Sequence, residues 1–372
     1  MSALDKRILF PDYMNCSLQL TGSIAKAFGQ AAPFGSLAQL DAMLTPQVRN
    51  IILLVLDGMG VSTLQEHLME DSFLRRHWLH TLSAVFPSTT LAATASLRTG
   101  LPPSQHGRLG WTMFFPQAQH SVDVYPNTLQ FTRCQAADHH IADRFLPLNE
   151  LSQRIARSTQ AQSVAISKHD RVHAATLSEI RLRIQEQLAL PGRHYLYVYD
   201  GQPDASMHDF GVNSPETHDI MAGIDLWCET LHQQLPKDTL LIITADHGLL
   251  DTEPVYMTDH DELAGMLVRP AFIEPRAASF QVKPECINQF PDAFHRAFPG
   301  QFLLLTKQEA LGKELFGPEP YMPGLEQYLG DFVALAIAGT ALYHSRGQDV
   351  LIGMHAGLTS SEMEVPLILC EK

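Results

Sequence analysis

The chain is 372 residues long, with 45% apolar and 18% charged residues and a formal net charge of −14. This length accommodates one large domain with an insertion or two medium domains, and the apolar content supports a well-buried core. A chain this acidic, without a run of Lys or Arg, has no long-range attraction for polymeric nucleic acid. A phosphate substrate would therefore need cations at its own site.

The cysteines and the first residues bear on the compartment of the protein. The five cysteines are scattered and never form a Cys-x-x-Cys pair, which argues against a disulfide framework and a thiolate metal site. The N-terminus lacks the apolar segment of a signal peptide, and no stretch reaches about 18 uninterrupted apolar residues. We therefore expect a cytoplasmic protein without a membrane span. The sequence carries no indication of an oligomeric state.

Short apolar runs alternate with helical patterns along the first two thirds of the chain. The run at 51–56, IILLVL, is typical of a strand buried on both faces of a parallel sheet. Similar runs follow at 163–166, 195–199 and 240–244. This alternation predicts an α/β fold with a mostly parallel sheet. Residues 112–150 are predicted to be irregular surface chain.

The pattern changes at about residue 270. Short strand-like pieces surround one helical stretch there, so we predict a small α+β insertion at 270–346. The chain then returns to a core-like strand at 349–353 and a final strand at 365–369. Residues 1–269 and 347–372 together form the predicted core.

Acidic and histidine side chains follow the predicted strands, where parallel sheets bind their ligands. They are Asp57, Asp204, His208, Asp246, His247 and His355. Taken singly, each has an ordinary explanation as a turn or capping residue. Together they form an oxygen and nitrogen ligand set without sulfur, which suits Zn²⁺ and, as a second choice, Mn²⁺. The set is large enough for two metal ions, which can clamp the attacking and leaving oxygens of a displacement at phosphorus.

A hydroxyl triplet, Ser88-Thr89-Thr90, stands before a helix-favouring run at 91–97. By itself this is a capped helix start, although a helix N-terminus also attracts anions. A threonine nucleophile needs a base or a metal. No histidine lies near Thr90 in a base-like arrangement, and the sequence lacks G-x-S-x-G, a P-loop and a dinucleotide fingerprint. Metal activation is therefore the more economical hypothesis.

These motifs resemble those of the alkaline phosphatase superfamily, and most nearly its type I phosphodiesterase/nucleotide pyrophosphatase family. They are DGMG at 57–60, FPSTT at 86–90 with TGLPPSQHG downstream, DxxxH at 204–208, ADHG at 245–248 and HAGL at 355–358. They occur in the family's order across residues 51–369. The resemblance implies an alkaline-phosphatase-like three-layer sandwich.

The resemblance also implies roles for individual residues. Thr90 would be the nucleophile and form a phosphothreonine-type intermediate. One metal ion would be held by Asp57, Asp246, His247 and the Thr90 oxygen. The other would be held by Asp204, His208 and His355. We interpret His106, which also matches a motif, as structural.

Two departures from the family pattern concern the substrate. The family's phosphate-binding Asn, 21 residues after the nucleophile, is Trp111 here. An indole offers one donor and no acceptor, so the phosphate must be held by other groups, such as helix N–H groups or Thr112. The segment after Thr90 also lacks the family's Asn-His-Tyr. Both departures bear on nucleotide specificity and leave the metal ligands intact.

We therefore predict a two-metal hydrolase that cleaves phosphodiester or pyrophosphate bonds in a small, nucleotide-like phosphoester. A phosphomonoesterase or phosphonate hydrolase on the same scaffold is the first alternative, although no extra Arg or Lys stands beside the motifs to bind a monoester's additional charge. A mutase is disfavoured because the insertion is small and late. A non-catalytic metal-binding protein is the remaining alternative, but none of the seven expected positions is lost.

Overall fold

The computed structural model describes residues 8–132 and 134–372. Within these ranges the larger sheet has seven strands in the order β2-β18-β9-β1-β8-β6-β7. Its parallel strands are β1 (Asn50–Leu56), β6 (Gln162–Ser167), β7 (Val172–His173), β8 (His194–Asp200) and β9 (Thr239–Thr244). These include the four apolar runs predicted as strands. β18 (Glu364–Glu371) is antiparallel to both β9 and β2 (Trp78–Ser83).

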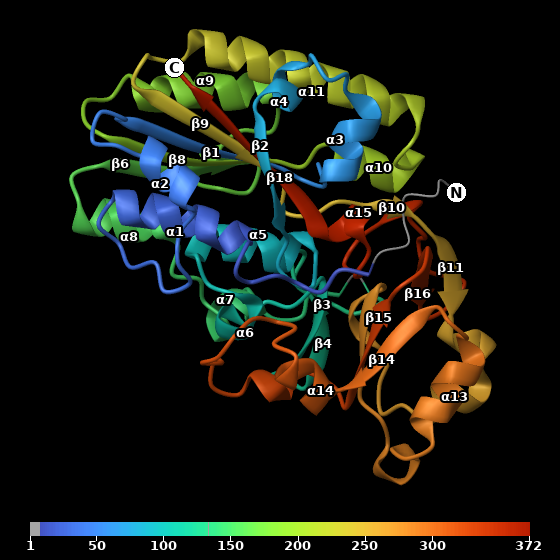
Figure 1. The fold of residues 1–372 in the computed structure, drawn as a ribbon. Coiled ribbons are helices and arrows are strands. Elements are labelled where there is room, and N and C mark those ends of the chain that lie inside the picture. Colours follow the sequence, from blue (N-terminus) through green and yellow to red (C-terminus); the bar gives the residue numbers. More distant parts are fainter. Residues whose placement is uncertain (1–7, 133) are drawn as a thin grey trace.

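Helices cover both faces of this sheet and give three layers (Figure 1). α9 (Leu177–Leu188) and α11 (Pro215–Gln234) lie on one face. α1 (Ser17–Ala27), α5 (Thr90–Thr99) and α8 (Leu151–Ser158) lie on the other. Because helices cover both faces, every residue of β1 is buried, which explains why its sequence is continuously apolar. Shorter helices connect these elements: α2 (Ala38–Met43), α3 (Val61–His67), α4 (Phe73–Arg76), α6 (Pro103–His106), α7 (Ile141–Phe145) and α10 (Asp204–Phe210).

A second sheet lies beyond the α5 layer, at the lower end of Figure 1. Among the described residues it has the strand order β14-β15-β13-β12-β3-β4-β5. Four of its strands come from the predicted insertion: β12 (Phe272–Glu274), β13 (Ala277–Phe280), β14 (Phe302–Thr306) and β15 (Phe332–Ala336). The others are β3 (Thr112–Phe115), β4 (His120–Asp123) and β5 (Thr128–Leu129). The prediction that 112–150 is irregular was therefore wrong for 112–129, where short strands extend this sheet, and for 141–145, which form α7.

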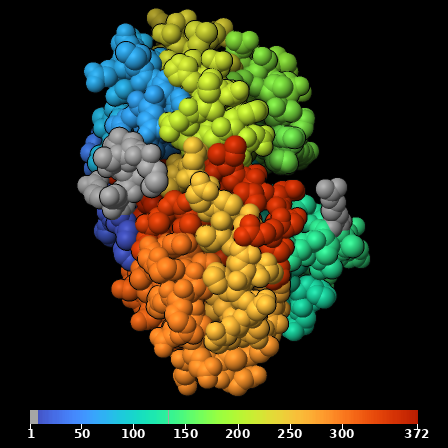
Figure 2. All heavy atoms as spheres, turned by 90° about the vertical axis from the view of Figure 1, so that its right-hand side faces the viewer, coloured from blue at the N-terminus to red at the C-terminus, as the bar shows by residue number. Residues whose placement is uncertain are grey.

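The part of the chain around residue 300 gathers at one end of the molecule, coloured orange in Figure 2. It contains α13 (Phe290–Ala297) and α14 (Lys307–Gly312) beside β13, β14 and β15. Phenylalanines form its core, among them Phe280, Phe290 and Phe294. The exact boundaries of the insertion stay a prediction, and the first seven residues of the predicted core lie outside the described residues.

Short strand pairs connect the two sheets. β10 (Leu250–Asp251) is antiparallel to β17 (Gly353–Met354), and β11 (Glu253–Tyr256) is parallel to β16 (Thr340–Tyr343). The predicted core strand at 349–353 was thus wrong. Only its last residue is extended, and it pairs with β10 instead of the larger sheet.

The remaining short elements are α12 (Asp261–Gly265), α15 (Ser360–Met363) and the 3₁₀ turns Met257–Asp259, Pro284–Cys286 and Leu325–Tyr328. Across the described residues, no helix combines the length and apolar character needed to span a membrane.

A buried ion pair joins the second sheet to the chain around His355. The Arg276 Nε and Nη2 atoms lie 2.6 and 2.8 Å from the two carboxylate oxygens of Glu362, and both side chains have 0% exposure. Arg276 also donates to the Thr340 carbonyl, while Glu362 accepts from the amides of Gly357 and Thr359. Both charges are thus paired and well supplied with hydrogen bonds, as buried charges require.

We expect Arg276→Met to lower the free energy of unfolding by about 3–5 kcal/mol, because it leaves the Glu362 charge buried without its partner. Urea denaturation would measure this loss. The matched control is Arg183→Met, which removes the exposed pair with Glu186 and should cost less than about 1 kcal/mol. Equal losses in the two variants would contradict the prediction.

Candidate active site

The larger sheet brings several of the predicted residues to one edge. Asp57 directly follows β1, and Asp246 and His247 follow β9. Asp204 is the first residue of α10, shortly after β8. Because these strands are parallel neighbours, their carboxyl ends lie at the same edge of the sheet.

Close backbone approach at Gly58 helps to bring these groups together. Gly58 has φ +71°, and a Cβ atom there would lie 2.6 Å from Leu249 Cδ1 and 2.9 Å from Asp204 Cβ. Its amide donates to Asp246 Oδ1 at 3.1 Å. The DGMG turn therefore needs glycine at this position, both for its left-handed backbone and for the space beside Asp204.

The first cluster surrounds the Thr90 hydroxyl. Thr90 Oγ1 lies 3.1 Å from His247 Nε2 and 3.4 Å from Asp57 Oδ2. His247 Nε2 lies 3.3 Å from Asp57 Oδ1 and 3.7 Å from Asp246 Oδ2. Three ligand atoms, one from each of Asp57, Asp246 and His247, all lie within 4.8 Å of one another. The three side chains can therefore share one cation.

The second cluster centres on Asp204. His208 Nε2 lies 3.2 Å from Asp204 Oδ2, and His355 Nε2 lies 4.0 Å from Asp204 Oδ1. Asp204 and His355 also form a possible cation site with His247, whose ring stacks on His355 with centroids 4.0 Å apart. The structure thus brings all seven predicted residues together. His247 stands between the two clusters, although the sequence hypothesis places it in only one.

Backbone carbonyls fix the orientation of two of these histidines. His208 Nδ1 lies 2.7 Å from the Gly353 carbonyl, and His247 Nδ1 lies 3.2 Å from the Gly248 carbonyl. A carbonyl only accepts, so each Nδ1 carries the donated proton. In the neutral ring this leaves Nε2, which faces the aspartates, with a lone pair for a metal ion.

The buried carboxylates of this site lack compensating positive charge. Burial raises the pKa of Asp57 well above its usual range, and the charges of Asp246 and Asp204 raise it further. Within the described ranges, ion pairs to these three aspartates come only from histidines. Asp204 Oδ1 and Asp246 Oδ2 are buried without a hydrogen-bond partner. Divalent cations would satisfy these oxygens and the clustered negative charge, so the side chains fit the predicted metal ions.

Two further residues contact this site, and the sequence interpretation missed both. The Tyr199 hydroxyl donates to Asp57 Oδ2. Glu274, in β12, accepts from Thr89 Oγ1 at 2.6 Å and from the Trp111 amide at 2.7 Å. Glu274 is 6% exposed, and burial raises the pKa of its carboxyl to about 7. Neither residue belongs to a motif, so no local pattern could have identified it.

Three motif-adjacent residues have other contacts. The Trp111 side chain is 47% exposed and packs against Tyr125, with ring centroids 5.8 Å apart. The Thr112 hydroxyl donates to Asp123 at 2.6 Å. His106 is buried against the Ser96 hydroxyl, and burial lowers its pKa to about 3, so it stays neutral. These contacts agree with a structural role for His106.

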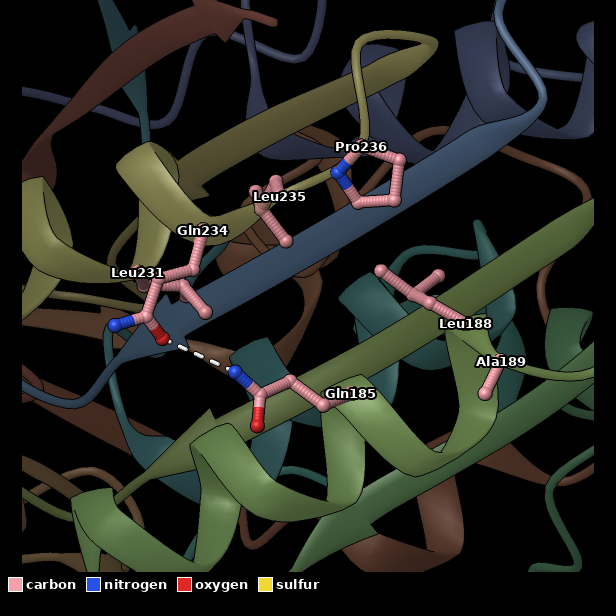
Figure 3. Close-up of a pocket in the computed structure, with 7 residues that line it drawn as sticks. All are labelled: Gln185, Leu188, Ala189, Leu231, Gln234, Leu235 and Pro236. Atoms are coloured by element: carbon pink, nitrogen blue, oxygen red, sulfur yellow. Dashed lines mark hydrogen bonds between the residues drawn. The ribbon is translucent and has the colours of Figure 1, made fainter.

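A separate pocket lies between α9 and α11 (Figure 3). Its lining is mainly apolar and includes Leu188, Leu231 and Leu235, and Gln185 donates to Gln234 across it at 3.0 Å. It contains none of the seven predicted residues and no buried charge. This pocket offers no chemistry comparable to that at the edge of the sheet.

Comparisons with known proteins bear on the family and on the fold. Residues 51–356 match the family model described as type I phosphodiesterase / nucleotide pyrophosphatase. No curated protein matches the chain.

Among solved structures, murine ectonucleotide pyrophosphatase/phosphodiesterase 5, an inactive variant in complex with AMP, is 17% identical with a TM-score of 0.66. The human protein of that name is 18% identical with a TM-score of 0.65. In both cases the match covers 86% of this chain and 87% of the other. At such low identity the structures show the fold alone, and they confirm the predicted alkaline-phosphatase-like architecture.

The raised pKa of Glu274 predicts a pH-dependent stability. Between about pH 4.5 and pH 7 the folded chain holds a proton at Glu274 that the unfolded chain has lost, so stability falls as pH rises through this range. Glu274→Gln replaces the carboxyl with an amide that does not titrate, so this pH-dependent loss of stability disappears. Relative to the unsubstituted chain, the free energy of unfolding of the variant should therefore rise by about 3 kcal/mol from pH 4 to pH 8. Urea denaturation of both proteins in chelator would measure the difference, and a constant offset across pH would contradict the prediction.

Proposed function

The chain belongs to the type I phosphodiesterase / nucleotide pyrophosphatase family, and on that premise we propose that it is a two-metal hydrolase with Thr90 as its nucleophile. The family assignment supports hydrolysis of phosphodiester or pyrophosphate bonds. The observation that carries the finer proposal is the position of Thr90 Oγ1, 3.1 Å from His247 Nε2 and 3.4 Å from Asp57 Oδ2 at the start of α5.

The side chains of the two clusters would hold the metal ions. Asp57, Asp246 and His247, with the Thr90 oxygen, would hold one, while Asp204, His208 and His355 would hold the other. The chemistry that such ions supply is stabilisation of negative charge on oxygen, at the nucleophile and at the leaving group. A set of imidazole nitrogens and carboxylate oxygens suits Zn²⁺, with Mn²⁺ second.

The chain's own groups perform the covalent steps. Thr90 Oγ1 gives up its proton and forms a bond to phosphorus while the bond from phosphorus to the leaving oxygen breaks. The leaving oxygen takes up a proton, and a phosphothreonine remains. Water then attacks phosphorus, breaks its bond to Oγ1 and restores the hydroxyl. The Thr112 hydroxyl donates its proton to Asp123 and is therefore not free to bind the phosphate. We propose instead that the N–H groups of the first turn of α5 bind a phosphate oxygen.

The charge around the site favours a diester over a monoester. The nearby arginines are committed to carboxylates: Arg98 contacts Asp170 and Glu150, and Arg276 contacts Glu362. A monoester carries an additional negative charge for which these side chains provide no free cation. We therefore retain the phosphomonoesterase and phosphonate hydrolase only as alternatives.

A small nucleotide-like phosphoester is the substrate we propose. The murine relative in complex with AMP supports this class of ligand, although Trp111 stands where the family has Asn. The predicted cytoplasmic location stays a prediction.

Thr90→Ala should lower kcat for bis(p-nitrophenyl) phosphate by about 10³-fold or more, because the alkoxide that attacks phosphorus is lost. Thr90→Ser is the matched control and should keep most of the activity. Elemental analysis of the zinc-loaded proteins should find two metal ions per chain in the unsubstituted protein and in the serine variant. Near-normal turnover by the alanine variant would disprove the role of Thr90.

Bis(p-nitrophenyl) phosphate should be hydrolysed with a kcat/KM at least about tenfold above that for p-nitrophenyl phosphate, since the monoester's extra charge finds no free cation. Parallel steady-state assays with Zn²⁺ and with Mn²⁺ would measure the ratio. A ratio below one would favour the monoesterase. Two bound metal ions with no hydrolysis of either substrate would favour the non-catalytic alternative.

A further inference from the structure

The first turn of α5 begins without its usual side-chain cap. Thr89 occupies the N-cap position with extended backbone angles of −135° and 148°, but its hydroxyl makes no capping hydrogen bond. A threonine there ordinarily accepts from an amide of the first turn. Other helices of this chain follow that rule, since Ser72, Thr176, Ser214 and Thr306 each accept such a bond. Thr89 differs from these four residues and resembles Thr359 before α15, whose hydroxyl donates to Glu362.

Glu274 is the hydrogen-bond partner of the Thr89 hydroxyl. The Thr89 hydroxyl donates to Glu274 Oε1 at 2.6 Å, and the same oxygen accepts from the Trp111 amide at 2.7 Å. The carboxyl is more than nine-tenths buried, with 6% exposure. The Thr89 hydroxyl thus donates to this buried carboxyl and accepts no hydrogen bond from an amide of α5.

The backbone beside Glu274 is held in a strained conformation. Ile273 has φ +85°, which is disfavoured for a β-branched residue. A Cβ atom at Gly110 would lie 2.7 Å from Ile273 Cγ2, so glycine is required for this close approach. Strain of this kind persists only where the surrounding packing enforces it. The packing of β12 against the turn at Gly110 thus fixes where Glu274 presents its carboxyl.

The withdrawal of Thr89 leaves donors free beside the proposed nucleophile. The first amide of this helix with a backbone acceptor is that of Ala93, which donates to the Thr89 carbonyl at 2.9 Å. The amides of Thr90, Leu91 and Ala92 donate to no acceptor in the part of the chain that the structure describes. Such amides at a helix N-terminus attract anions.

We propose that Glu274 is a positioning residue that keeps the first turn of α5 uncapped, so that these amides remain available to the phosphoryl oxygens of the substrate. The proposal rests on the proposed function, because it assigns the amides to the phosphate attacked by Thr90. It differs from a merely structural role in one respect. When Glu274 is lost, the freed Thr89 hydroxyl caps the helix and competes with the phosphate.

The test compares four zinc-loaded proteins: the unsubstituted chain, Glu274→Ala, Thr89→Val and the double variant. Calorimetric titration with inorganic phosphate measures binding, and bis(p-nitrophenyl) phosphate gives kcat and KM. Glu274→Ala should weaken phosphate binding about tenfold, the size of a restored cap. Thr89→Val should bind normally. The double variant should recover to within about threefold of Thr89→Val, because the competing hydroxyl is gone.

A structural role gives a different pattern, in which the two losses add and the double variant is the weakest of the four. That result would overturn the proposal, as would unchanged binding by Glu274→Ala or no phosphate binding by any of the four proteins. Glu274→Leu, which fills the site without an acceptor, replaces the alanine variant if that protein is insoluble. If the unsubstituted chain binds phosphate but hydrolyses no phosphodiester, the proposed function fails, and the binding series still decides the role of Glu274.

Discussion

The buried pair of Arg276 and Glu362 is the constraint on which the site depends. Glu362 orders the chain after His355 by accepting from the Gly357 amide, while Arg276 ties that chain to the second sheet. The Ser88 hydroxyl, two residues before the proposed nucleophile, donates to the Gly357 carbonyl at 3.1 Å. One ion pair therefore fixes both the loop that carries His355 and the loop that leads to Thr90. The free-energy cost of removing Arg276 and Glu362 from water is offset because both charged groups make several hydrogen bonds.

This arrangement explains how an acidic protein can present a phosphate site. The edge of the larger sheet concentrates Asp57, Asp204 and Asp246, which by themselves would repel a phosphate. Histidines are their only ion-pair partners in the described ranges, and two aspartate oxygens stay buried without a partner. Cations bound there would reverse the sign of the local field. The net charge of the chain then discourages polymeric nucleic acid without preventing a small phosphoester from binding.

The sequence predicts the parallel sheet and its carboxyl-end residues because fully buried strands have a simple signature. The run at 51–56 is apolar on both faces, and an acid directly after it stands at the sheet edge. The strands at 112–129 lack that signature, since they are short and partly exposed and take their partners from the second sheet. Glu274 and Tyr199 were missed for a related reason. Their contacts, to Thr89 and Asp57, join segments more than 140 residues apart, and no local pattern encodes such a pairing.

The replacement of the family's Asn by Trp111 changes which part of the chain can contact the phosphate. The Trp111 side chain is directed to Tyr125 and partly to solvent, and its amide is taken by Glu274. The amide is then not free for a phosphate oxygen. The backbone amides of α5 are neutral donors beside Thr90, and their positions are fixed by the helix and not by a rotamer. In the role proposed for Glu274, its carboxyl keeps these amides uncapped and also occupies the Trp111 amide, so Trp111 and Glu274 belong to one arrangement.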